Sequence, residues 1–284
     1  MHFFLLLSQF LVFFSFLTVH GLPLVPRGYS HLISESWSEG LFMSKQFSSE
    51  EQKVFEPKLT GLSLGPVLTK EGHNNAGIHS VSGAYKDPHS GTTHQGETLV
   101  VKFLNPTKMV EGKNAKYGWG EVAALKVVGD YVASGMLENQ GKLVPVIVMK
   151  KQPGADIHDS TAYKGANEEK KKEMRAKLAK AMCAKVAKMA SEKLLYHHDN
   201  HMGNVMATLT GSEITNVNLI DYGADWCYRV KPGTSEKVLL AFCEKDWITI
   251  YYWVPSSGPP KLCAHILRRT EHNFEGIGGE LDPI

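Results

Sequence analysis

The sequence lacks several features that would assign it to a familiar class. It has four cysteines but no Cys-x-x-Cys pair, which argues against a structural zinc module. Its 31 basic and 29 acidic residues leave a net charge of +2, so bulk charge predicts no nucleic-acid partner. There is no Asn-x-Ser/Thr glycosylation site, because proline blocks Asn105-Pro106-Thr107. What is left is a globular chain of 284 residues, enough for one fair-sized domain or two small lobes.

The N-terminal segment lacks charge altogether. It contains no Lys, Arg, Asp or Glu, is apolar from Phe3 to Val19, and ends in the small-residue pattern Val19-x-Gly21. We interpret residues 1–21 as a signal peptide, which predicts a protein that is secreted or held in the lumen of the secretory pathway, without membrane contact after cleavage. A type II signal anchor is the alternative, since the apolar run approaches the length of a membrane span.

The next part of the chain predicts an antiparallel sheet with one helix. Three β-rich runs, "GPVLTKEG", "GIHSVSGAY" and "GETLVVKFLNP", are separated by Gly, Asn, His and Pro, which is typical of a strand meander. Residues 118–136 place Val122, Leu125, Val128 and Val132 at helical spacing. "KLVPVIVMKKQPG" then indicates a buried strand that ends at a Pro-Gly break. The predicted order is β-β-β-α-β.

The second half predicts a long helix and a hairpin. Over 168–193, apolar residues recur every three or four positions, with lysines on the other faces: Met174, Leu178, Met182, Val186 and Met189. We interpret the lysines as a solvated face, with a polyanion-binding surface as the alternative. After a His-rich loop, residues 205–221 predict a hairpin that turns at Gly211-Ser212.

The His-rich loop "LLYHHDNHMGNV" and the later "NLIDYGAD" contain polar residues suited to a metal and a phosphate. Asp199 and Asn204 lie in the loop, and Asp221 ends an apolar run before a glycine. Carboxylate and amide oxygens are ligands that suit Mg²⁺, which often bridges substrate phosphates. Zinc bound by the loop histidines is the weaker alternative, because close neighbours in a loop rarely converge on one tetrahedral site.

These residues carry a family resemblance. "HHDNHMGNV…LIDYG" resembles the catalytic and metal-binding loops of the protein-kinase-like superfamily, whose pattern is H-R-D-x-x-x-x-N followed by D-F-G. Upstream, "LVVKF" places Lys102 at the position of the V-A-I-K lysine, and "GEVAALKVV" places Glu121 on the following helix. "EGHNNAG" lies between the first two strands, where a phosphate-covering loop belongs. The resemblance covers about residues 56–230 and five elements in the correct order.

The resemblance implies a role for each matching residue. Lys102 would hold the α- and β-phosphates of ATP and pair with Glu121. Asp199 would orient the acceptor hydroxyl and take its proton, while Asn204 and Asp221 would bind Mg²⁺. Taken singly, Lys102 would be interpreted as a snorkelling strand-end lysine, and Glu121 as a charge on a helix face.

The resemblance also implies a two-lobed α+β fold. Residues 22–55 would be an N-terminal extension, 56–151 a β-rich N-lobe and 152–284 a reduced, mainly helical C-lobe. The backbone from Gly72 to Gly77 would cover the phosphates, although the middle glycine of the usual motif is missing.

Other departures concern the branch of the superfamily. His198 replaces the arginine before the catalytic aspartate, Tyr222 replaces the phenylalanine of D-F-G, and no A-P-E follows. The His-x-Gly-Asn run also resembles the D-x-H-x-G-N of aminoglycoside and choline phosphotransferases.

The resemblance therefore implies an ATP- and Mg²⁺-dependent kinase. The first expectation is a compact secreted kinase that phosphorylates a protein hydroxyl, similar to small effector kinases that microbes deliver into host cells, so that its substrate could be a host protein. A small-molecule kinase, a non-catalytic pseudokinase and a nucleotidyl transferase are the alternatives.

The cysteines predict a disulfide. Four cysteines can be paired in three ways, and we expect at least one disulfide in an oxidising compartment. We expect the pair Cys227–Cys243, because both residues follow the catalytic segments of the resemblance and a short loop separates them.

Overall fold

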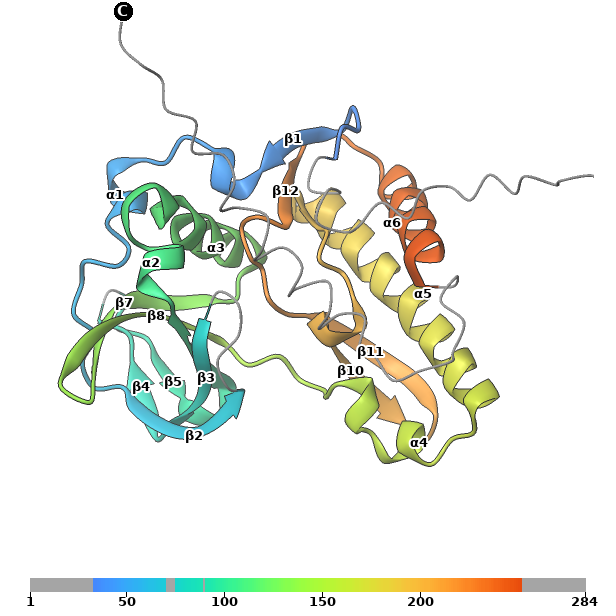
Figure 1. Ribbon diagram of the computed structural model, residues 1–284, viewed down its shortest axis with the longest axis horizontal. Helices are drawn as coiled ribbons and strands as arrows, with labels where there is room; N and C mark the ends of the chain where they lie inside the picture. The colour runs from blue at the N-terminus through green and yellow to red at the C-terminus, as the bar shows by residue number, and fades with distance from the viewer. Residues whose placement is uncertain (1–32, 70–74, 89, 252–284) are drawn as a thin grey trace, which may run out of the picture. The chain divides into compact units, whose positions relative to one another are not determined.

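The computed structural model describes residues 33–69, 75–88 and 90–251 (Figure 1). The predicted signal peptide, Gly72 and Cys263 lie outside these ranges. Within them, helices occur together with antiparallel sheets, so this part of the chain is α+β, as predicted. None of its helices is long and apolar enough to cross a membrane.

A five-stranded antiparallel sheet has the strand order β2-β3-β6-β8-β7. The bounds, in that order, are Ser63–Thr69, Asn75–Ser82, Leu99–Leu104, Lys142–Lys150 and Tyr131–Asn139. β6 and β8 are rich in β-branched residues and occupy interior positions, as such residues favour. Gln140 and Gly141 both have positive φ and make the two-residue turn between β7 and β8. Four of the five strands confirm the predicted ones.

The fifth strand, β7, corrects the predicted helix over 118–136. Helix α3 is Ala115–Val128, and Gly129 ends it with φ +85°, donating its N–H to the carbonyls of Leu125 and Lys126. A left-handed residue after the last turn is the common way for a helix to stop, and glycine adopts it at least cost. Val132, which also fits helical spacing, therefore lies on β7 and is buried there.

Shorter elements connect and extend these. Ser48 and Glu51 form a capping box at the start of α1, in the predicted extension. The bounds of the short elements are β1 Ser38–Leu41, α1 Ser49–Gln52, β4 Ala84–Lys86, β5 Thr93–Gln95, α2 Pro106–Met109, α4 Thr161–Lys164 and β9 Leu195–His197. β4 pairs with β5 in a separate two-stranded sheet.

The second half of the described chain is built on α5 (Glu168–Lys193). Asn167 caps its start by accepting the Lys170 N–H. All five apolar residues predicted to share a face are buried. α5 packs against α6 (Glu236–Tyr251) and β11 (Figure 1). It also packs against β9. The predicted long helix is confirmed.

Two small sheets complete the fold. β10 (Val205–Thr210) and β11 (Glu213–Leu219) form the predicted hairpin, with Gly211 at its turn. The other sheet has the order β1-β12-β9, in which β12 is Cys227–Val230. β1 thereby joins part of the predicted extension to a strand near the end of the described chain.

A disulfide is present, but the predicted pair is wrong. Cys183 on α5 is bonded to Cys243 on α6, with their Cα atoms 5.5 Å apart, whereas Cys227 is a buried free thiol. Cys227 lies opposite His197 in the sheet. Its position on β12 therefore determines which residues it contacts, and its short separation from Cys243 along the chain does not.

Candidate functional site

Lys102 lies on β6, where alternate side chains face opposite sides of the sheet. Its neighbours Val101 and Phe103 belong to one buried apolar cluster, while Leu104, two residues on, belongs to the larger cluster that includes α3. Lys102 shares the face of Leu104. The strand periodicity therefore aims a lysine at α3, the helix that carries Glu121.

The lysine forms two ion pairs in a buried setting. Its Nζ is 2.6 Å from Glu121 Oε1 and 2.9 Å from Asp221 Oδ1. Lys102 and Glu121 are almost fully buried, whereas nearly half of the Asp221 side chain is exposed. A lysine at this depth is stable only with carboxylate partners, and it has two.

The charges of these three groups are interdependent. Burial by itself would lower the pKa of Lys102, but the carboxylates of Asp221 and Glu121 outweigh it and raise that pKa above its usual value. The Lys102 ammonium is the largest influence on Asp221 and lowers its pKa. Burial raises the pKa of Glu121, against the opposing effect of Lys102. Lys102 is therefore cationic and Asp221 anionic near neutral pH.

Asp221 has a backbone conformation that is uncommon for a residue with a side chain. Its φ is +61°, in the left-handed region that Asp and Asn tolerate better than most residues. Such conformations persist where the surroundings enforce them, and they occur often at functional sites. Here the ion pair with Lys102 and the contacts of the Asp221 carbonyl hold the residue in place.

His197, the last residue of β9, supplies one of those contacts. Its Nε2 lies 3.0 Å from the carbonyl oxygens of both Ile220 and Asp221. Because carbonyl oxygens only accept, Nε2 must carry the proton. Complete burial is the main influence on His197 and lowers its pKa, so the ring is neutral. It ties the Asp199 loop to the segment that carries Asp221.

Asp199 and Asn204 are held together in the loop that follows β9. Asn204 Nδ2 donates to both the carbonyl oxygen and the carboxylate Oδ2 of Asp199, at 2.8 Å each. The Asn204 carbonyl in turn accepts the Ile220 N–H at 2.9 Å. His201 Nε2 lies 3.7 Å from the other Asp199 oxygen. Together with the His197 contacts, this connects the loop to the Ile220–Asp221 segment at two points.

Among these residues, a divalent cation could be held by one carboxylate and one amide. In the described ranges, no group of three or more His, Cys, Asp or Glu side chains is arranged to hold a metal. Asp221 offers a half-exposed carboxylate, and Asn204, whose Nδ2 is engaged, offers its Oδ1. One carboxylate and one amide suit Mg²⁺, which keeps several waters and phosphate oxygens as ligands. The donor set does not resemble that of a structural zinc site.

The predicted phosphate-covering segment is described only at its end. Gly77 lies on β3 with φ +119°, and its N–H donates to Asn75 Oδ1 at 3.1 Å. A side chain there would be strained, so glycine is favoured on backbone grounds. Gly72 lies outside the described residues.

The structure brings Lys102, Glu121 and Asp221 into direct contact and joins them through backbone and His197 contacts to Asp199 and Asn204. The sequence suggested His197 only as a weak zinc ligand and predicted no role for it beside Asp221, although its place two residues before Asp199 matches the histidine of H-R-D. Neither the protein-family models nor the curated proteins that were compared with the chain match it.

Proposed function

We propose that the chain is an ATP- and Mg²⁺-dependent phosphotransferase of the two-lobed, protein-kinase-like type. One observation carries the proposal, namely the buried lysine that pairs with both a helix glutamate and the aspartate before Tyr222-Gly223. That aspartate is linked through His197 to the Asp199–Asn204 loop. These are the contacts that four of the five sequence elements require if they form one site; the fifth, the phosphate-covering segment, is described only at its end.

The sheet gives independent support. In the five-stranded antiparallel sheet, helix α3 lies between β6 and β7 in the chain order. Lys102 lies on β6 and Glu121 on α3. β8 leads on to the segment with α4, α5 and the β10–β11 hairpin. This order agrees with a β-rich N-lobe over 56–151 and a reduced C-lobe from 152.

In this mechanism, Lys102 binds the α- and β-phosphates, and Glu121 keeps its ammonium in place. Asp221 and Asn204 would hold Mg²⁺, which would supply charge neutralisation at the phosphates. Asp199 orients the acceptor hydroxyl. The bond from the acceptor oxygen to the γ-phosphorus forms, the bond from that phosphorus to the bridging oxygen breaks, and the hydroxyl proton passes to the Asp199 carboxylate.

The acceptor in this proposal is a hydroxyl of a protein. Small-molecule kinases of this superfamily usually carry a large acceptor-binding insertion in the C-lobe. After Asp221, the described chain contains only β12, α6 and their connections. The described residues after Asp221 therefore supply no such insertion, which favours a macromolecular acceptor. The apolar N-terminal segment and the Cys183–Cys243 disulfide favour a secreted protein, so the substrate would lie in the secretory lumen or inside a host.

Labelled ATP tests the proposal. The purified protein is incubated with Mg²⁺ and either γ- or α-labelled ATP, together with candidate proteins or with aminoglycosides and choline, and products are identified by mass spectrometry. Transfer of the γ-label to protein supports the proposal. Transfer of the γ-label to a small molecule would instead indicate a small-molecule kinase. Transfer of the α-label would indicate a nucleotidyl transferase, and no transfer would indicate a pseudokinase.

A further inference from the structure

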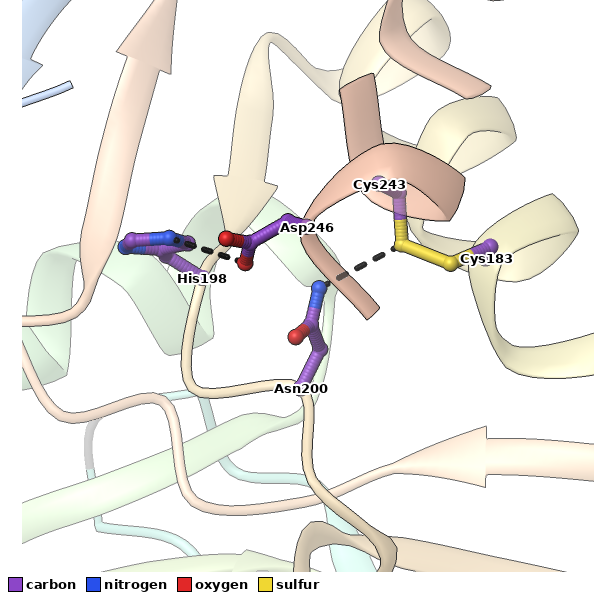
Figure 2. Close-up of a disulfide and its surroundings, with 5 residues drawn as sticks. All are labelled: Cys183, His198, Asn200, Cys243 and Asp246. Carbon is purple, nitrogen blue, oxygen red and sulfur yellow. Dashed lines mark hydrogen bonds and ion pairs between the residues drawn. A yellow bond between two sulfur atoms is a disulfide. The ribbon is translucent and has the colours of Figure 1, made fainter. Parts of the chain in front are cut away.

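Helix α6 contacts the loop that carries Asp199 through both neighbours of that residue (Figure 2). On one side, His198 Nε2 lies 3.3 Å from Asp246 Oδ2. On the other, Asn200 Nδ2 donates to Cys243 Sγ at 3.4 Å. Asp199 thus lies between two residues that are attached to the same helix, although α6 contributes no residue to the site described above.

The disulfide fixes that helix at the same place. Cys243 is bonded to Cys183 of α5 and is completely buried. Asp246 lies three positions further along α6, so it shares a helix face with Cys243. The covalent bond therefore fixes the turn of α6 from which Asp246 reaches His198.

His198 cannot easily exchange Asp246 for water. The imidazole is almost fully buried, and its ring lies near those of four aromatic side chains, from three different elements and the segment before β12: Tyr196, Trp226, Tyr228 and Phe242. Among the described residues, His198 Nδ1 has no hydrogen-bond partner. If Asp246 were removed, the buried His198 Nε2 would lose its carboxylate partner, and the loop would lose the restraint next to Asp199.

We propose that Asp246 and the Cys183–Cys243 disulfide position the catalytic loop, and that turnover therefore depends on the oxidised disulfide. The inference rests on the proposed phosphotransferase function for its kinetic consequence. Lys102, Glu121 and Asp221 lie on β6, on α3 and after β11, so the ion-pair partners of the phosphate-binding lysine lie outside the loop that α6 contacts. Loss of the restraint should lower kcat and leave the KM for ATP nearly unchanged.

The first experiment measures kcat and KM for ATP in Asp246→Ala. Misplacement of a catalytic group by a fraction of an ångström should lower kcat by about tenfold. Asp246→Asn keeps an oxygen that can accept from His198 and should recover most of the rate. Glu244→Ala, which removes a carboxylate from the same helix two residues earlier, is the matched control and should behave as wild type.

The second experiment tests the disulfide. The double variant Cys183→Ala/Cys243→Ala should show the same reduced kcat with KM for ATP retained. Dithiothreitol should lower the wild-type rate to that of the double variant and should not change the double variant. Wild-type turnover that is unaffected by verified reduction would overturn the role of the disulfide.

Hydrogen exchange separates this inference from the proposed function. Peptides that cover residues 196–204 should exchange faster in Asp246→Ala than in Glu244→Ala, whether or not the wild type transfers phosphate. If the wild type is inactive, the proposed function fails while exchange still decides the positioning. Unchanged exchange in 196–204, or faster exchange spread over the whole protein, would overturn it.

Discussion

At the scale of single residues, Asp221 combines features that stability alone would not favour. It has positive φ, a half-exposed carboxylate and a lowered pKa whose largest cause is a buried lysine. A residue that served only to neutralise Lys102 could be buried with it, as Glu121 is. The exposure of the Asp221 side chain leaves it accessible to a ligand, which fits binding of Mg²⁺.

Asp221→Ala should therefore abolish transfer and leave the fold intact. Loss of a metal-binding carboxylate removes positioning and charge neutralisation together, so we expect the rate to fall by at least about a hundredfold. Steady-state kinetics and circular dichroism check this. Asp159→Ala, which removes an exposed carboxylate paired with Lys164 at the surface, should keep the wild-type rate. An active Asp221→Ala protein would show that the metal assignment is wrong.

The Lys102–Glu121 pair makes a separate prediction about stability. Lys102→Met leaves Glu121 buried without its cation, and breaking a buried ion pair in this way costs about 3–5 kcal/mol. Glu121→Gln in the same chain removes the stranded charge, so the double variant should be more stable than Lys102→Met alone. Denaturant unfolding of the two single variants and the double variant measures the coupling. Strict additivity would contradict it.

The candidate site residues could be selected from the sequence because each occurs within a short motif, and the motifs occur in order. What could not be predicted is their connection. His197 acts through a ring nitrogen on two carbonyls far along the chain, and His198 is held by Asp246. Asp246 belongs to no motif, and a motif does not show which carbonyls a histidine ring contacts, so only the three-dimensional arrangement identifies these two contacts.

At the scale of elements, Gly129 ends α3 and allows the chain to continue as strand β7. Gly129→Ala should destabilise the protein by about 1–2 kcal/mol, because a left-handed conformation costs an alanine about that much. Steric overlap does not contribute to this destabilisation, since a Cβ added at Gly129 would meet no atom within 4 Å. Gly129→Asn should cost less, because Asn tolerates this conformation. Thermal or denaturant unfolding measures both, and equal stability of wild type and Gly129→Ala would contradict the account.

The same boundary explains why the sequence did not predict β7. Val122, Leu125, Val128 and Val132 fit one helical face, and periodicity cannot show that the last of them belongs to a strand. Gly129 was the available stop signal. The disulfide was mispredicted for a related reason: closeness along the chain favoured Cys227–Cys243, but α5 and α6 pack together and place Cys183 opposite Cys243.

At the scale of the whole molecule, little chain separates the site from the next fixed element. After Asp221, residues 222–226 lead directly into β12, which is paired with β1 on one side and β9 on the other. Many protein kinases have a longer segment here, whose phosphate pairs with an arginine before the catalytic aspartate. This chain has His198 instead, and His198 is already held by Asp246.

We therefore predict activity without phosphorylation of this segment. A phosphate there would meet no arginine fork and would gain little charge-assisted bonding, while β12 is already ordered by its sheet. Protein made in bacteria with its disulfide formed should have the same kcat before phosphatase treatment as after treatment and removal of the phosphatase. A sample treated with heat-inactivated phosphatase is the control. A large drop in kcat only with active phosphatase would show that a phosphate orders the site.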